Sequence, residues 1–194
     1  MSDEELVNHE LENNNYITTN DLINIGISKI NITKLVEKGI LKKVSHGIYM
    51  RPDILEDEYY LIQLRYPKTV FSYNTAFHIL NMTNLTPSKI DITSIRGKAV
   101  VGNYNVHYVT EDKFDLGIIT VESPFGNPIK VYNAERCICD MLKNENEFDL
   151  ELRNRILDNY FNSNFKNIGL IEDYAKKLGV HEKVNTIIEV MMKW

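Results

Sequence analysis

The stretch TTNDLINIGISKINITKLVEKGILKKVSHGIYM, residues 18–50, decides the fold of this chain. Thr18 with Asp21 three residues later is typical of a capping box, in which each side chain bonds the other's free backbone N–H at a helix start. Gly26 ends this first helix, because glycine adopts a left-handed conformation at the lowest cost. Ser28 then begins a second helix.

The second helix ends at Gly39, and a hairpin follows it. Residues 40–44 and 48–50 are short runs of β-forming residues on either side of the turn Ser45-His46-Gly47. Two helices joined at a glycine and followed at once by a hairpin have the element order of a winged helix-turn-helix. The sequence therefore predicts this fold for the N-terminal part of the chain.

One face of the second helix is apolar and the other is polar. With successive residues about 100° apart, Ile32, Leu35 and Val36 form one stripe that we expect to be buried. Ile30 falls on the other side, among amide, hydroxyl and ammonium groups. Such groups bond base edges and phosphates when a helix enters a major groove. The hairpin and its flanks add donors suited to phosphates or the minor groove.

These features predict a DNA-binding surface. Its expected members are Ser28, Lys29, Asn31, Thr33, Lys34, Lys38, Lys42, Lys43, Ser45, His46 and Arg51. Residues 16–52 hold six Lys and Arg residues against two acids, a net charge of +4, whereas the whole chain has −5. A basic segment in an acidic chain is typical of nucleic-acid binding. The alternative is an ordinary solvated helix face, and helix-turn-helix patterns also occur in protein-binding modules.

Length and composition favour two domains. The chain has 194 residues, of which 43% are hydrophobic, enough for a buried core. No run approaches the ~20 apolar residues of a membrane span, and the acidic N-terminus does not resemble a signal peptide, so we expect a cytoplasmic protein without membrane contact. We place a DNA-binding domain at residues 1–52 and a second domain at residues 53–194, joined without a Gly/Ser-rich tether.

The second domain reads as α+β. Helices are also expected at residues 2–12 and 53–65. Strands are expected at 69–71, 90–95, 98–101, 106–110, 118–122 and 129–132, and further helices at 73–80, 133–143, 150–161, 168–178 and 181–193. This order predicts a small, mostly antiparallel sheet followed by a helical end.

The second domain shows no enzyme motif: it has no Gly-rich phosphate loop, G-x-S-x-G elbow or HExxH pattern. Cys137 and Cys139 point apart on a helix and lack a zinc ligand set, so we expect buried thiols and no cofactor. Glu135 and Asp140 are candidates for a nuclease-like or metal-binding carboxylate pair, yet their spacing puts them on different helix faces. We expect Arg136 to form a structural pair with one of them near the helix start.

Other candidate residues have ordinary interpretations. We expect His78 at the edge of the core and His107 facing solvent. Tyr104, Tyr108 and Tyr132 form either a recognition patch or half-buried sheet residues, and we favour the second.

The combination of the winged helix with FSYNTAFHILNMT (71–83) and IKVYNAERCICDML (129–142) resembles the AbiEi family. These are antitoxins of bacterial abortive-infection, type IV toxin–antitoxin systems, and the resemblance spans nearly the whole chain. The second stretch is similar to the family's ERT…D signature, with Cys137 where threonine is usual. The residues that carry the resemblance are Ser72, Thr75, Glu135, Arg136 and Asp140.

The resemblance implies two roles. The winged helix would bind inverted repeats in its own promoter, as double-stranded DNA, and repress transcription. The C-terminal domain would counteract a nucleotidyltransferase-like toxin without forming a stable complex with it. How it counteracts the toxin stays open, since binding to the toxin's target, an RNA for example, and an enzymatic reversal are both compatible.

A segment with a net charge of +4 makes few phosphate contacts and binds DNA weakly as a single copy. We therefore expect a monomer in solution and a cooperative pair on paired half-sites. Two other functions stay as alternatives: a nuclease or nucleic-acid-modifying enzyme guided by the winged helix, and an adaptor whose winged helix contacts protein.

Overall fold

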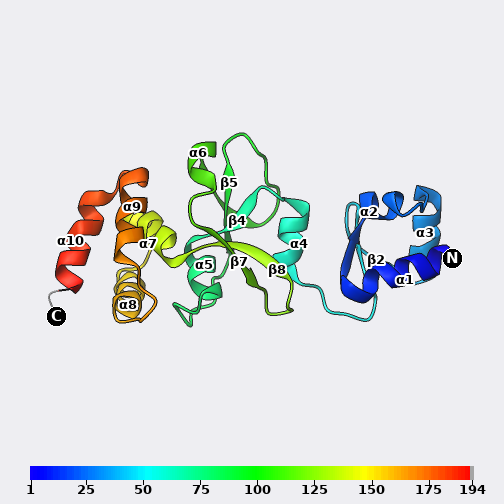
Figure 1. The fold of residues 1–194 in the computed structure, drawn as a ribbon, viewed down its shortest axis with the longest axis horizontal. Helices are drawn as coiled ribbons and strands as arrows, with labels where there is room; N and C mark the ends of the chain where they lie inside the picture. The colour runs from blue at the N-terminus through cyan, green and yellow to red at the C-terminus, as the bar shows by residue number, and fades with distance from the viewer. Residues whose placement is uncertain (193–194) are drawn as a thin grey trace. The chain divides into compact units, whose positions relative to one another are not determined.

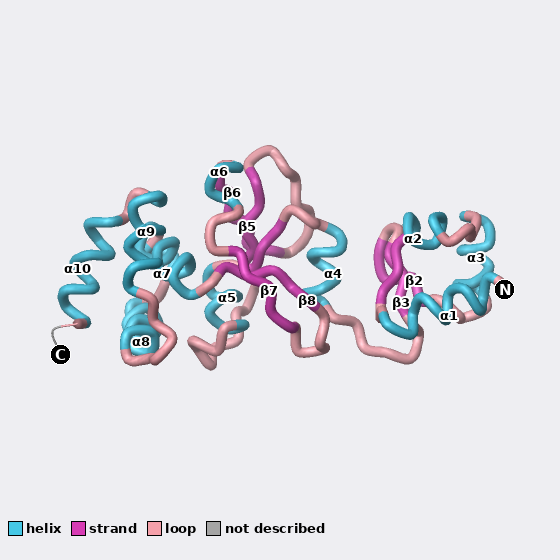
Figure 2. Tube along the Cα trace, viewed as in Figure 1, coloured by secondary structure: helices cyan, strands magenta, loops and turns pink. Residues whose placement is uncertain are grey.

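A computed structural model describes residues 1–192 (Figures 1 and 2). The chain separates into two units, one formed by Met1–Arg65 and the other beginning at Tyr66. The first unit extends past residue 52 because helix α4 (Glu58–Arg65) packs onto it. The rings of Tyr60 and Tyr16 lie 5.2 Å apart, and Nη2 of Arg65 donates to Oγ of Ser45 at 2.6 Å. The structural boundary lies after Arg65, and the predicted boundary between the two functional domains at residues 52 and 53 stays a prediction.

The first unit has the element order of a winged helix. It runs through α1 (Asp3–Asn13), β1 (Tyr16–Thr18), α2 (Thr19–Asn24), α3 (Lys29–Glu37), β2 (Lys42–Ser45) and β3 (Ile48–Met50). The strands form an antiparallel sheet in the order β1-β3-β2. Strand β1 was not predicted from the sequence.

The helix boundaries of this unit follow from the residues that cap them. Backbone N of Asp21 donates to Oγ1 of Thr18 at 3.3 Å, and N of Thr18 donates to Oδ2 of Asp21 at 2.9 Å, so the predicted capping box is confirmed. Oγ of Ser28 accepts from N of Asn31 at 3.3 Å and caps α3. Gly26 between the helices has φ +94°, a conformation that favours glycine.

The core of the first unit confirms the predicted orientation of α3. Ile32 and Leu35 are 2% and 3% exposed, and Val36 packs against the same cluster. Their partners come from α1, β1, α2 and the segments that flank α3: Val7, Leu11, Ile17, Leu22, Ile27 and Leu41.

The second unit is built on a five-stranded sheet in the order β6-β5-β4-β8-β7. Its strands are β4 (Thr69–Phe71), β5 (Ile90–Ile95), β6 (Tyr104–Val109), β7 (Ile118–Glu122) and β8 (Pro128–Tyr132). The pairs β4–β5 and β7–β8 are antiparallel, whereas β4–β8 and β5–β6 are parallel. The sheet is therefore mixed, where the sequence predicted mostly antiparallel pairing.

The parallel pairing of β5 and β6 explains this difference. Ile90 lies opposite Tyr104, and Ile95 lies opposite Val109, so the chain must return along the sheet between the two strands. Residues 98–101, predicted as a strand, belong to this returning connection instead. The turn at Arg96-Gly97 therefore starts a crossover rather than a hairpin.

Helices complete the second unit. They are α5 (Tyr73–Ile79), α6 (Glu111–Phe114), α7 (Ala134–Lys143), the 3₁₀ turn η1 (Glu145–Glu147), α8 (Leu150–Phe161), α9 (Ile168–Leu178) and α10 (His181–Met191). Figure 1 shows α7, α8, α9 and α10 gathered at one end of this unit. The α+β class with a helical end is confirmed. Helix α6 was not predicted, and the predicted last residue of the final helix, Lys193, lies outside the described residues.

Within residues 1–192, none of the helices combines the length and the apolar character that crossing a membrane requires.

Candidate nucleic-acid interface

The outward face of α3 is formed by Ile30, Thr33, Lys34 and Glu37. They follow the i, i+3, i+4, i+7 spacing of one helix face, opposite the buried Ile32 side. All four are exposed, and Ile30 is 71% exposed. Helical spacing predicted that Ile30 lies on this side, but Ile30 is not among the predicted site residues.

Asn31 and Lys38 lie at the side of α3 that faces the start of α1. Nδ2 of Asn31 donates to Oδ2 of Asp3 at 2.7 Å, and Nζ of Lys38 lies 2.6 Å from Oε1 of Glu4. The hydrogen bond and the charge of Glu4 raise the pKa of Lys38. Two predicted DNA-binding residues are thus held by acids of α1, which the sequence analysis missed.

Acidic partners also hold part of the hairpin region. Nζ of Lys42 lies 2.8 Å from Oε1 of Glu56. The guanidinium of Arg51 donates two hydrogen bonds to the carboxylate of Asp53, from Nε at 3.0 Å and from Nη2 at 2.6 Å. These bonds raise the pKa of Arg51 and lower the pKa of Asp53. Ser45 is also held, but by a cation, because its hydroxyl accepts from Arg65 as described above.

The remaining predicted residues are exposed and carry the uncompensated charge. No ion pair is found within residues 1–192 for Lys29, Lys34 or Lys43, and all three are exposed. His46 is exposed at the hairpin turn, and Ser28 is exposed while it caps α3. The net positive charge of this surface therefore comes from α3 and the first strand of the hairpin.

The paired cations of the same surface stay available to an anion. The side chains of Lys38 and Glu4 are 62% and 46% exposed, and exposed ion pairs contribute only about 0–1 kcal/mol. Replacement of such an acid by another anion therefore costs little. Within residues 1–192 no acid forms an ion pair with Lys29, Lys34 or Lys43, although the exposed Glu37 lies on the same face of α3 as Lys34, so we expect these three lysines to dominate anion binding.

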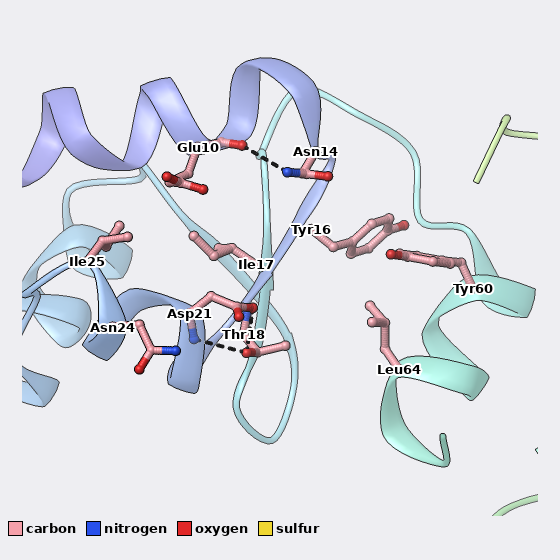
Figure 3. A pocket seen from close by; sticks show the side chains of 10 residues that line it. All are labelled: Glu10, Asn14, Tyr16, Ile17, Thr18, Asp21, Asn24, Ile25, Tyr60 and Leu64. Atoms are coloured by element: carbon pink, nitrogen blue, oxygen red, sulfur yellow. Dashed lines mark hydrogen bonds between the residues drawn. The ribbon is translucent and has the colours of Figure 1, made fainter. Parts of the chain in front are cut away.

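A cavity of about 360 Å³ in the first unit has a different character (Figure 3). It lies between α1, β1, α2 and α4, with Glu10, Asp21, Tyr16 and Tyr60 among its lining residues. Burial, followed by the charges of Asp57 and Asp21, raises the pKa of Tyr60. The described lining residues include two carboxylates and no Lys or Arg, so this cavity does not suit a phosphate backbone.

In the second unit, the motif residues Ser72 and Thr75 are buried and tie the start of α5 to β5. Oγ1 of Thr93 donates to Oγ of Ser72 at 2.9 Å. Backbone N of Asp91 donates to Oγ1 of Thr75 at 2.8 Å. Both hydroxyls therefore have a structural role, because they join the start of α5 to β5.

Arg136 is fully buried at the start of α7. Its Nε donates to Oδ2 of Asp140 at 2.9 Å, and its Nη1 donates to the carbonyl oxygens of Lys113 and Leu116 at 2.7 and 2.8 Å. The guanidinium carbon lies 4.3 Å from the centre of the Tyr132 ring. Burial raises the pKa of Asp140 even beside this cation. The predicted structural pair is therefore Arg136 with Asp140.

Glu135 has a separate partner, because the hydroxyl of Tyr160 donates to its Oε1 at 3.0 Å. The two carboxylates of the α7 motif therefore serve different contacts and do not form a joint site. Within residues 1–192, no group of three His, Cys, Asp or Glu side chains is arranged to hold a metal ion. Cys137 and Cys139 are buried free thiols, as predicted.

His107 departs from its predicted place. We expected it to face solvent, but its ring stacks on Tyr73 with centroids 3.6 Å apart. Its Nε2 lies 3.2 Å from Oδ1 of Asp91, and its Nδ1 lies 3.6 Å from Oε2 of Glu147. These contacts come from α5, β5 and η1, which lie far from His107 in the sequence, so strand alternation alone gave the wrong answer.

The sheet tyrosines differ from one another. Tyr132 is fully buried, and its hydroxyl donates to the carbonyl oxygen of Phe114 at 2.8 Å. Tyr104 is half-buried and Tyr108 is exposed. The three do not share one environment, so they do not form a common recognition patch.

Comparison with known proteins adds a similar fold and a family match over the N-terminal part of the chain. A search of curated protein sequences found no match. The crystal structure of the RV2827C protein from Mycobacterium tuberculosis is similar, with a TM-score of 0.52 and 12% sequence identity over 94% of this chain and 79% of that chain. At this identity the similarity concerns the fold alone. Residues 4–52 match the family model described as "Transcriptional regulator, AbiEi antitoxin". The family resemblance inferred from the sequence is thus confirmed over residues 4–52, where this chain matches the transcriptional regulators of the AbiEi antitoxin family.

Proposed function

We propose that this protein is a DNA-binding transcriptional autorepressor and the antitoxin of a type IV toxin–antitoxin system for abortive infection of phage-infected cells. The observation that carries the proposal is the exposed face of α3, which includes Lys34 and has Lys29 beside it, both without an ion pair within the described residues, inside the segment that matches the AbiEi family. A helix with such a face enters the major groove, and the hairpin contacts the adjacent backbone.

The target is the protein's own promoter, as a duplex with inverted repeats. Three uncompensated lysines give one winged helix about three strong phosphate contacts, and each contributes about −0.9 to the slope of log K against log salt. A single copy therefore binds weakly, and repression requires two copies bound cooperatively to paired half-sites. The free protein is a monomer, which light scattering after size-exclusion chromatography checks; a stable dimer contradicts it.

The second unit counteracts a nucleotidyltransferase-like toxin without forming a stable complex with it. Its motif residues support the fold, because Ser72, Thr75 and Arg136 are fully buried and hydrogen-bonded. The surface that opposes the toxin therefore lies elsewhere on the unit. The enzymatic alternative gains no support from Glu135 and Asp140, which bind different partners.

Promoter binding by the full-length protein tests the proposal. Fluorescence anisotropy with a promoter duplex is measured over a range of salt concentrations, for the wild type and for Lys34→Ala. We expect steep weakening with salt, and for Lys34→Ala a slope smaller by about 0.9 for each bound copy. The thermal stability of the variant stays within about 0.5 kcal/mol of the wild type, because Lys34 is exposed. Binding that is insensitive to salt would instead favour a protein partner for the winged helix.

A further inference from the structure

The outward face of α3 begins with an apolar patch, formed by Ile30 and the methyl group of Thr33. Oγ1 of Thr33 donates to the carbonyl oxygen of Lys29 at 3.3 Å, one helical turn earlier. This bond turns the hydroxyl toward the backbone, so the methyl group is left to face outward. Residues three apart on a helix are neighbours on its surface, so Ile30 and Thr33 are adjacent on this face.

Ile30 has no structural role that explains it. It is 71% exposed and stands outside the core cluster that contains Ile32 two residues later. A β-branched residue also has a slightly lower helix propensity than alanine or lysine. Neither packing nor local conformation therefore requires isoleucine at this position.

Asn31, the amide residue expected to contact bases, does not lie on the outward face of α3. Asn31 lies at the side of α3, where its amide donates to Asp3. The position at the front of the helix belongs to Ile30, and the N-terminal residues of a recognition helix are the ones that contact base edges. The first side chain of the outward face that could contact a base edge is therefore apolar.

In the major groove, thymine is the base that presents a methyl group, at C5. Lys29 and Lys34 stand beside the patch without acidic partners, which suits a polyanion rather than an apolar protein surface. We propose that Ile30, together with the methyl group of Thr33, reads thymine C5-methyl groups in the operator. This inference rests on the proposed function, and it assigns the chemical group by which α3 selects its site.

The test uses the full-length protein and a duplex selected by it from a random-sequence pool. Each thymine of the selected half-site is replaced in turn by deoxyuridine, which pairs with adenine in the same way and lacks only the methyl group. Affinity is measured by fluorescence anisotropy. For the wild type, we expect one or two replacements to weaken binding about fourfold, the scale of one buried methyl group.

Two variants locate the contact. Ile30→Ala should weaken binding to the thymine duplex and should no longer distinguish thymine from uracil at those positions. Ile23→Ala is the matched control, because Ile23 is an isoleucine of α2 that is 43% exposed. It should keep the full difference between thymine and uracil. Circular dichroism checks that both variants melt like the wild type.

The outcomes separate the inference from the proposed function. If no duplex is selected, DNA binding itself is wrong. If a duplex is selected but uracil has no effect, or if Ile30→Ala keeps the wild-type response to uracil, DNA binding stands and the reading of thymine by Ile30 is wrong.

Discussion

Lys34 lies in α3 and Lys38 caps its C-terminus one helical turn later, and the two lysines differ in their ion pairs. Lys38 is held by Glu4 at 2.6 Å, whereas no ion pair is found for Lys34 within the described residues. Helical periodicity placed both on the solvent side of α3. The partner of Lys38 comes from α1, more than thirty residues earlier in the chain, and no local pattern reports such a contact. The candidate surface therefore carries less uncompensated positive charge than its number of lysines suggests.

Removal of the competing acid should strengthen DNA binding. Glu4→Gln frees Lys38 for a phosphate and removes a negative charge beside the groove. We expect an affinity gain of about twofold to threefold at low salt, the scale of one screened surface charge. Glu12→Gln is the matched control, because it makes the same charge change at the other end of α1. Equal gains for both variants would show an effect of net charge alone.

Arg136 is the residue whose loss should damage the second unit most. Arg136→Ala leaves Asp140 buried without its partner, and breaking a buried pair in this way costs about 3–5 kcal/mol. Arg136→Lys should recover only part of this loss, since an ammonium group cannot reproduce the hydrogen bonds of the planar fork. Chemical denaturation monitored by the fluorescence of the second unit's aromatic residues checks the loss. A change below 1 kcal/mol would mean that the buried pair is not a main support of the fold.

At the scale of elements, local signals predicted most of the boundaries. The bounds of β4, β5, β7, α8 and α9 agree with the sequence analysis, because caps, turns and apolar spacing act within a few residues. The same reasoning failed for residues 98–101 and for the direction of β6, since strand pairing is decided by contacts distant in the sequence. It also placed the buried face of α3 correctly but missed Asp3, Glu4, Glu56 and Arg65 as partners of the candidate site.

The helical end of the second unit should respond to acid. Glu145 in η1 accepts from Lys183 of α10 at 2.7 Å and from Arg153 of α8 at 2.6 Å. These contacts, that of Lys183 first, lower the pKa of Glu145 from its usual 4.5. A lowered folded pKa contributes stability that is present above pH 4.5 and is lost as the pH falls through the folded value.

Hydrogen exchange measured between pH 6 and pH 3 should therefore show faster opening of α10 in acid, after correction for the intrinsic exchange rate. Glu145→Gln should open α10 already at pH 6 and should flatten the pH dependence. If the variant keeps the wild-type profile, other carboxylates control the acid response of this end.

At the scale of the whole molecule, the two units can be tested separately. A fragment of residues 1–65 keeps α4 with the winged helix, and so retains the contacts of Tyr60 with Tyr16 and of Arg65 with Ser45. Each fragment, 1–65 and 66–194, is expressed in cells that carry the toxin and a promoter reporter. We expect residues 66–194 alone to restore growth and only the full chain to repress fully. If neither fragment restores growth, antitoxicity requires the winged helix, and silencing of toxin transcription becomes the simpler explanation.

The order of strands in the second unit also has a consequence for synthesis on the ribosome. Strand β4 lies at the centre of the sheet, yet its residue Phe71 pairs with Val131 of β8, which emerges much later. The winged helix closes its three-stranded sheet within residues 16–50 and depends on no such distant partner. Since chains are made from the N-terminus and distant pairings form slowly, the winged helix should fold first. A nascent chain of this protein should therefore complete the fold of residues 16–50 while the sheet of the second unit still lacks its central pairing.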